Sequence, residues 1–212
     1  MTQAYDILRG ISVFAGLNDQ ELAVLGTHVN TRRYPKNTVI IQEGDEANAL
    51  YVIESGQAKV YLSNEDGKEV IINMLGQGEL FGELALIDDA PRSASVKTTK
   101  PTTLAVISRS GFKQLLASHT DIALRLLVDM TRRVRLLSES IRNLALLDVY
   151  GRVAKVLLDL AQEHDGRLII REKPTQQDIA NRVGASREMV ARIMKDLLIG
   201  GYGLLLASVY IL

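Results

Sequence analysis

A glutamate and an arginine lie nine residues apart in the segment 82–95, and together their side chains suit a sugar phosphate. Gly82 follows a predicted strand and opens a short predicted helix. Backbone N–H groups at such a helix start can point at an anion, which a glycine allows to approach closely. The guanidinium of Arg92 can hold two phosphate oxygens, and the carboxylate of Glu83 can accept a hydrogen bond from a sugar hydroxyl. The alternative is a surface ion pair between these two side chains, worth about 0–1 kcal/mol.

A second group of polar residues, nearer the C-terminus, has the spacing of a helix-turn-helix. Ser186 is a good N-cap for the second helix, whose early exposed face carries Arg187, Glu188 and Arg192. Arginine suits guanine O6 and N7, and glutamate can accept from cytosine N4. The alternative is a solvated helix with an (i, i+4) ion pair between Glu188 and Arg192, worth about 0.3–0.5 kcal/mol. The positions that would pack the two helices at a tight turn are Ile179, Ala180, Val183, Gly184, Ala185, Val190 and Ile193.

The composition narrows the classes of function. The chain has 212 residues, 47% of them hydrophobic and 24% charged, and it has no cysteine, which excludes disulfides, thiolate metal sites and cysteine nucleophiles. His28, His119 and His164 lie far apart and outside the predicted strands, so we expect neither a metal site nor an enzyme. Residues 1–130 hold 12 basic and 16 acidic side chains, whereas residues 131–200 hold 13 and 9. This asymmetry favours a regulatory first part and an anion-binding second part.

We expect β-strands to hold the residues of the segment 82–95 in place. A short helix is predicted over residues 17–28. From about residue 30 to residue 108, short β-rich runs separated by glycines predict an antiparallel sandwich or barrel. The predicted runs are Thr38–Gln42, Leu50–Glu54, Ala58–Leu62, Glu69–Met74, Ser95–Thr98 and Thr103–Ile107, with a hairpin loop at Asn64–Gly67.

We expect helices to hold the predicted helix-turn-helix residues in place. Residues 110–147 have a helical pattern in which apolar residues recur three and four apart, as in a heptad repeat. This spacing favours a homodimer seam over residues 123–144, and the alternative is an amphipathic helix packed on its own barrel. Helices are also predicted over 149–162 and 175–199, with a short strand at 168–170 between them. The heptad residues are Leu127, Met130, Val134, Leu137, Ile141 and Leu144.

The letters F-G-E-L-A followed by P-R-S-A, placed on a predicted barrel, resemble the phosphate-binding cassette of cyclic-nucleotide-binding domains. The resemblance covers roughly residues 10–145. It implies that Arg92 binds the cyclic phosphate, that Glu83 binds the ribose 2′-hydroxyl and that Ser93 adds a phosphate contact. The other cassette residues and the apolar barrel positions expected to enclose the purine and sugar are Gly82, Leu84, Val60, Ile72 and Leu75.

The long helix is expected to contact the base. Leu137 and Ser138 match a Thr-Ser pair that meets adenine in the cAMP receptor protein branch of the bacterial Crp/Fnr regulators. Ser138 keeps a hydroxyl, for which the alternative is a solvated helix-face serine, whereas Leu137 replaces the threonine. The resemblance implies cAMP as the effector. Because of Leu137, the alternative is the same regulator architecture with a different effector, or DNA binding without an effector.

The string S-R-E-x-V-x-R resembles the recognition helix of the same branch of Crp/Fnr regulators, and residues 143–149 match its hinge. The resemblance implies binding to double-stranded DNA with a palindromic operator of TGTGA-like half-sites, and RNA polymerase as a further partner. In this comparison the base-reading positions are Arg187, Glu188 and Arg192, and the positions that can touch phosphate are Ser186, Gln177 and Lys195.

These features together predict an α+β protein in three parts. A jelly-roll-like cyclic-nucleotide-binding β-barrel is expected over residues 1–117, a long dimerisation helix over 118–147, and a winged helix-turn-helix over 148–212. The predicted function is that of a cytoplasmic, homodimeric, allosteric transcription regulator that responds to cAMP. No signal peptide is evident. The longest uncharged stretch, 197–212, has 16 residues, whereas a membrane-spanning helix needs about 20, so we expect no membrane association.

The C-terminal tail departs from the family pattern, in which a polar and basic hairpin wing follows the recognition helix. Residues 200–212 carry no charge, and no phosphate-contacting turn is recognisable after Tyr202. We hypothesise that this altered tail weakens DNA affinity or promotes self-association. A polar wing grafted in its place is then predicted to raise operator affinity.

Overall fold

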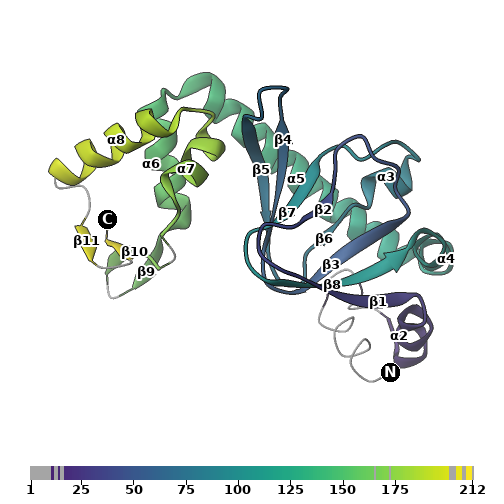
Figure 1. The fold of residues 1–212 in the computed structure, drawn as a ribbon. Helices are drawn as coiled ribbons and strands as arrows, with labels where there is room; N and C mark the ends of the chain where they lie inside the picture. The colour runs from purple at the N-terminus through teal and green to yellow at the C-terminus, as the bar shows by residue number, and fades with distance from the viewer. Residues whose placement is uncertain are drawn as a thin grey trace. The chain divides into compact units, whose positions relative to one another are not determined.

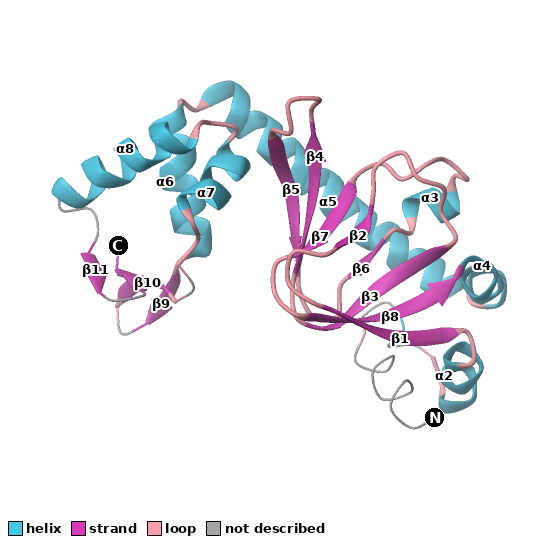
Figure 2. Ribbon diagram, in the orientation of Figure 1, coloured by secondary structure: helices cyan, strands magenta, loops and turns pink. Residues whose placement is uncertain are grey.

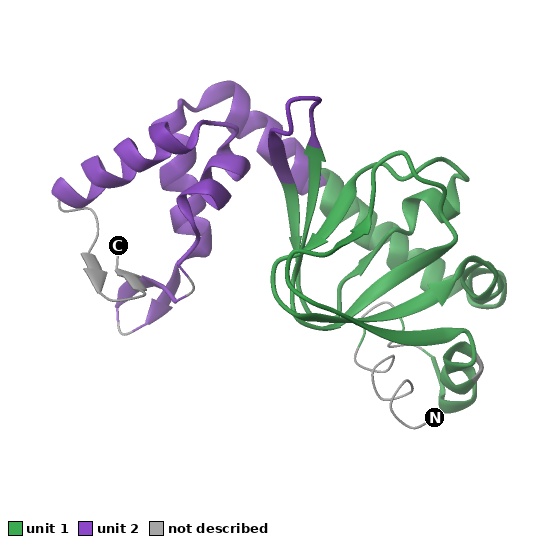
Figure 3. Ribbon diagram, in the orientation of Figure 1, with its two compact units in different colours: residues 1–62, 72–134 green, residues 63–71, 135–212 purple. Residues whose placement is uncertain are grey.

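The computed structural model describes residues 11, 14, 17–164, 166–171, 173–200, 204–206 and 209–211, the last two ranges as backbone only. The chain divides into two compact units, which are described separately (Figure 3). The first unit comprises residues 1–62 and 72–134, and the second comprises residues 63–71 and 135–212. The three-part division predicted from the sequence stays a prediction.

Most of the first unit consists of two four-stranded antiparallel sheets, in which only the hairpin tip at residues 63–71 is assigned to the second unit (Figures 1 and 2). Side chains from both sheets form one apolar cluster, which includes Ile53, Phe81 and Leu104. The alternation of inward and outward side chains along each strand places these residues in the interior. One sheet has the order β1 (Val29–Tyr34), β8 (Thr102–Ser108), β3 (Ala49–Ser55), β6 (Leu80–Phe81), and the other has the order β2 (Val39–Ile41), β7 (Ser95–Thr98), β4 (Ala58–Ser63), β5 (Glu69–Leu75).

Helices cover the other face of the β3–β8 sheet. Leu50 and Val52 of β3 share a second core cluster with side chains of α2 (Asp19–Gly26), α4 (Arg109–Ser118) and the start of α5 (Thr120–Leu146). The predicted helix over 110–147 is therefore two helices. His119 has φ −135° and ψ 91° and separates them. The break falls in a run of serine, threonine and aspartate, which compete with the helix for backbone hydrogen bonds.

The predicted strand runs are confirmed to within a residue or two at their ends, and the hairpin loop forms where expected, with Gly67 N–H donating to the carbonyl of Asn64 at 3.0 Å. Two strands of these two sheets were not predicted. β1 has exposed side chains at its four central positions, because two of its residues are arginines, and so lacks apolar alternation. β6 is only two residues long, which is too short to produce a pattern.

The second unit is built on three helices, α6 (Val149–Leu160), α7 (Gln176–Val183) and α8 (Arg187–Ile199). Their buried side chains, which include Val153, Ile179 and Val190, form one apolar cluster. The helix predicted over 149–162 ends at Leu160, because the next residues form a strand. That strand belongs to a sheet of order β11 (Leu204–Leu206), β12 (Val209–Ile211), β10 (Arg167–Ile170), β9 (Gln162–His164).

The backbone of the uncharged tail continues this sheet. β11 and β12 pair antiparallel with each other, and β12 pairs with β10, as in a hairpin wing. Tyr202 lies outside the described residues, as do the side chains of the tail. The hypothesis that this tail weakens DNA binding therefore stays a prediction. Among the helices of the described residues, none is long and apolar enough to cross a bilayer.

Candidate functional site

The first predicted group of residues lies at the end of β6, where the backbone of Gly82 has φ +82°. A Cβ atom there would lie 2.7 Å from Nη1 of Arg92 and 3.0 Å from Cδ1 of Ile41. Glycine is therefore required twice, by the left-handed backbone and by the close approach of a guanidinium. The single-turn helix α3 (Leu84–Ile87) begins two residues later.

The guanidinium of Arg92 is buried beside this glycine, with the residue 6% exposed. Its Nη1 and Nη2 atoms donate to the carbonyls of Gly82 and Ala49, each at 2.6 Å, and it lies 5.9 Å from the ring centre of Tyr51. Within the described residues it forms no ion pair. Because a guanidinium has five N–H donors, three remain for another acceptor. Burial lowers the pKa of Arg92, a direction that an incoming anion would reverse.

The carboxylate of Glu83 is also buried, with the residue 2% exposed, but its partner is not Arg92. Oε1 accepts a hydrogen bond from Nη1 of Arg133 at 2.8 Å, while Nη2 of Arg133 donates to Leu80 and pairs with Asp129. Oε2 is buried and has no hydrogen-bond partner in the described structure. Burial raises the pKa of Glu83, although Arg133 opposes this effect. The alternative of a surface Glu83–Arg92 ion pair is therefore wrong.

Arg133 was not identified from the sequence. It lies 50 residues after Glu83 in the chain, on α5, where the sequence pattern indicates only an apolar heptad repeat. The only local signal is an (i, i+4) pair with Asp129, which is common on helix surfaces. No local pattern indicates that this arginine reaches a buried carboxylate.

Ten effector-binding residues were predicted, and eight of them lie in the first unit, where one pocket brings six together and leaves out two. Leu75 is buried in the core between the sheets, and Ile72 is 37% exposed on β5, so neither lines the pocket. Leu137 and Ser138 belong to the part of α5 in the second unit, and their predicted contact with a base stays a prediction. The predicted residues that line the pocket are Val60, Gly82, Glu83, Leu84, Arg92 and Ser93, and Arg133 joins them.

The second predicted group lies on α7 and α8, which meet at a tight turn. Gly184 has φ +66°, the left-handed conformation that ends α7. Thr175 and Asp178 form a reciprocal capping box at the start of α7, and the hydroxyl of Ser186 accepts from the N–H of Met189 at 3.2 Å at the start of α8. The cap at Ser186 is the one that the sequence predicts, whereas the capping box at Thr175 was not predicted, and together they fix where each helix begins.

The early face of α8 is exposed to solvent. Arg187, Glu188 and Arg192 are all exposed, and among the described residues no ion pair joins Glu188 to Arg192. The alternative of a helix stabilised by that pair is therefore not what the structure contains. Of the residues predicted to touch phosphate, Ser186 and Lys195 are exposed, whereas Gln177 is exposed but donates from Nε2 to Asn181 at 2.7 Å.

The apolar heptad positions of α5 do not pack into the core of the first unit. In that core, α5 contributes Ile122 and Leu126, which are almost fully buried. Five of the six heptad residues are 44–67% exposed, and Met130 is half-buried. Of these five, Leu127 and Val134 lie in the same unit as the barrel, and for these two the alternative in which the heptad positions pack on the barrel of the same chain fails. The exposed five are Leu127, Val134, Leu137, Ile141 and Leu144.

Comparisons with known proteins agree with this division of roles. Residues 31–119 match the family described as Cyclic nucleotide-binding domain, and residues 151–200 match the Crp-like helix-turn-helix domain. The chain is 40% identical to the cAMP-activated global transcriptional regulator CRP of Escherichia coli O6:H1 over 81% of this chain and 83% of the relative. It is 32% identical to a CRP-like cAMP-activated global transcriptional regulator of Mycobacterium tuberculosis, over 90% and 87%. The solved structure of a regulator described as c-di-GMP responsive, from Xanthomonas campestris, superposes with a TM-score of 0.78 at 30% identity, covering 92% of this chain and 99% of that one.

Proposed function

The chain belongs to the Crp/Fnr family of DNA-binding, non-enzymatic transcription regulators, and from this premise we propose that a cyclic nucleotide, cAMP, switches its affinity for DNA. The proposed protein is a homodimer that binds a palindromic operator and acts on RNA polymerase. Membership of this family accounts for DNA binding and for an effector domain of the nucleotide-binding type. We propose the identity of the effector, the homodimer and the operator sequence.

One observation carries the proposed effector class. Among the described residues, the buried guanidinium of Arg92 has no carboxylate partner, and beside it in the pocket one buried carboxylate oxygen of Glu83 has no donor. The unpaired carboxylate oxygen costs free energy, because a buried polar atom without a partner loses its hydration. The buried guanidinium has two carbonyl partners and keeps three N–H donors and a charge that an anion can satisfy. A ligand that has an anionic phosphate and a hydroxyl next to it supplies both missing partners, and a cyclic ribose phosphate has this combination.

The choice of cAMP rests on the relatives, and an alternative effector rests on Leu137. Relatives that are 40% and 32% identical to this chain are described as cAMP-activated. A relative that is 30% identical is described as c-di-GMP responsive. Leu137 lacks the hydroxyl that a matching threonine would offer to adenine, so a guanine-containing cyclic nucleotide is the second candidate.

The proposed DNA contact uses α8 and the proposed dimer uses α5. Arg187, Glu188 and Arg192 are free to read base edges, with Ser186, Gln177 and Lys195 at phosphate. The exposed apolar stripe of α5 suits a seam between two copies over residues 123–144. A dimer of this kind places its two recognition helices about 34 Å apart, so the operator is a palindrome. The resemblance of α8 to the recognition helix of the cAMP receptor protein branch implies TGTGA-like half-sites.

Two titrations test the proposal. In isothermal titration calorimetry, cAMP is expected to bind the full-length protein saturably and more tightly than cGMP or cyclic di-GMP. In a fluorescence anisotropy assay with a palindromic TGTGA duplex, cAMP is expected to raise DNA affinity by tenfold or more, against a scrambled duplex as control. Tighter binding of cyclic di-GMP would replace cAMP as the effector. No binding of any cyclic nucleotide would refute control by a cyclic nucleotide.

A further inference from the structure

Two loops meet at the backbone of Arg92. In the loop between β2 and β3, the carbonyl of Asp45 accepts from the N–H of Arg92 at 2.9 Å, and the N–H of Gly44 donates to the carbonyl of Arg92 at 2.9 Å. The loop between α3 and β7, which carries Arg92, is thus hydrogen-bonded to a segment distant in sequence. The place of the guanidinium depends on both loops.

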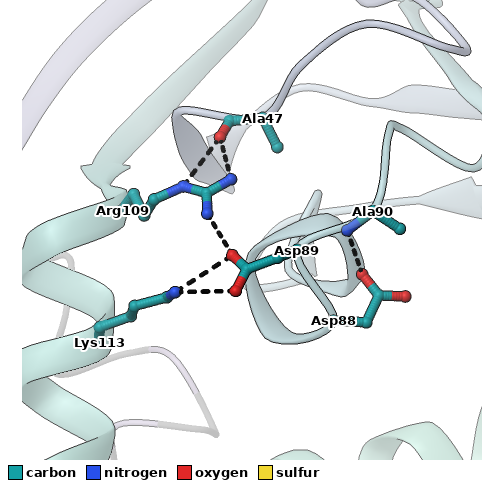
Figure 4. Close-up of polar contacts among 6 residues, drawn as sticks. All are labelled: Ala47, Asp88, Asp89, Ala90, Arg109 and Lys113. Carbon is teal, nitrogen blue, oxygen red and sulfur yellow. Dashed lines mark hydrogen bonds and ion pairs between the residues drawn. The ribbon is translucent and has the colours of Figure 1, made fainter.

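Helix α4 binds both loops from one face (Figure 4). Arg109 donates to the carbonyl of Ala47 from Nε at 3.0 Å and from Nη2 at 2.6 Å, and its Nη1 donates to the carboxylate of Asp89. Lys113, one turn further along, donates to both carboxylate oxygens of Asp89 at 3.1 and 3.3 Å. Because Phe112 of α4 is fully buried in the core, the two cations are held on a fixed support.

The backbone of Asp89 is in an unfavourable, left-handed conformation. Its φ is +56°, in the left-handed region that costs a non-glycine residue free energy. Lys113 and Arg109 lower the pKa of Asp89, so its carboxylate is ionised at neutral pH. The adjacent Asp88 differs, because its carboxylate accepts from the N–H of Ala90 at 3.0 Å, within its own turn. Only one of the two neighbouring aspartates therefore connects the loop to α4 in these contacts.

We infer that Asp89, Arg109 and Lys113 form a positioning cluster that holds the Arg92 loop ready for the effector phosphate. The inference rests on the function proposed above and adds residues that touch no effector. If the cluster is broken, the loop samples other arrangements, and the apparent affinity falls by the fraction of molecules that remain competent to bind. The cluster links effector affinity to α4, the helix that precedes α5 in the chain.

The test compares Asp89→Asn with Asp88→Asn in the full-length protein. Asparagine keeps the size of the side chain and tolerates the left-handed backbone, so the first variant removes the charge and replaces one acceptor oxygen by an NH2 donor. We expect Asp89→Asn to weaken cAMP binding about tenfold in calorimetry. We also expect it to speed hydrogen exchange of the Arg92 N–H in the effector-free protein, with the melting temperature nearly unchanged. Asp88→Asn is expected to leave the affinity and the exchange rate at wild-type values.

A double-mutant cycle identifies the partner on α4. Lys113→Met is expected to weaken cAMP binding to a similar extent, and combining it with Asp89→Asn is expected to add little, because both remove the same contact. Fully additive losses would overturn the cluster. So would an affinity or an exchange rate of Asp89→Asn equal to that of Asp88→Asn. If the wild-type protein binds no cyclic nucleotide, the proposed function fails, while the exchange rates still report whether the cluster holds the loop.

Discussion

Glu83 and Arg92 in the first unit are 2% and 6% exposed, whereas Glu188 and Arg192 on α8 in the second unit are exposed to solvent. Both pairs consist of the same two residue types. In the first pair, backbone carbonyls and Arg133 fix the side chains, and one carboxylate oxygen has no partner in the described structure. In the second pair, the side chains have no ion pair in the part of the chain that the structure describes.

The two pairs are suited to ligands of very different size. A small ligand must supply its affinity through few contacts, so its site is buried and its partners are held before it arrives. A DNA duplex offers many phosphates and base edges, so its reader is an exposed helix, and the position of that helix is fixed by caps and a turn. Disturbing a buried residue should therefore act through lost partners, and disturbing an exposed one through lost contacts with DNA.

The largest expected effect comes from replacing Arg92, the buried arginine of the first pair. Arg92→Leu should weaken effector binding by at least about 100-fold, because it removes the buried guanidinium that we propose as the partner of the effector phosphate. The fold should survive, as circular dichroism and a melting curve would show. Arg33→Leu, an exposed arginine on β1, is the matched control and should bind the effector normally. An undiminished response of Arg92→Leu would remove this residue as the phosphate ligand.

The next effect concerns the exposed side. Arg187→Ala should cost about 1–3 kcal/mol on the operator and much less on a random duplex, because a base contact distinguishes sequences. Anisotropy titrations with both duplexes at one salt concentration measure the two losses. Arg171→Ala, an exposed arginine outside α8, is the control. Equal losses on the two duplexes would mean that Arg187 touches phosphate and reads no base.

Gly82 in the first unit and Gly184 in the second unit both have left-handed backbones, so they can be compared directly. Gly82→Ala and Gly184→Ala should each destabilise the fold by about 1–2 kcal/mol through backbone strain. Only Gly82→Ala should also weaken effector binding, because its new methyl would lie 2.7 Å from Nη1 of Arg92, whereas the nearest atom at Gly184 is 3.9 Å away. Urea unfolding and calorimetry on both variants separate the two effects. Normal effector binding by Gly82→Ala would contradict the tight placement of the guanidinium.

The smallest expected effect is the pH dependence of stability. Burial raises the pKa of Glu83 above its ordinary value of 4.5, so the folded state takes up a proton at a higher pH than the unfolded state does. The wild-type protein should therefore gain stability relative to Glu83→Gln as the pH falls from neutral toward 4.5. Urea unfolding of the two proteins at several pH values measures this difference. A difference that stays constant with pH would show that burial and Arg133 cancel at this carboxylate.

Much of the fold could be predicted because its signals are local. The capping serine at 186, the glycine at 184 and the β-rich runs between glycines each depend on residues a few positions apart. The break at His119 and the strand β9 were not predicted, because helical spacing continues through both segments. The candidate site was predicted in part. The cassette residues share one pocket, but Ile72 and Leu75 lie outside it.

By itself, the sequence determined the type and order of the two ligand-binding parts, because caps, turns and apolar periods act over a few residues. Only the tertiary structure decided that Arg133 pairs with Glu83, that Leu75 belongs to the core and that Asp89 binds α4. Each of these contacts joins segments that are distant in the chain. Their geometry depends on how sheets and helices pack, and no local pattern of residue types specifies it.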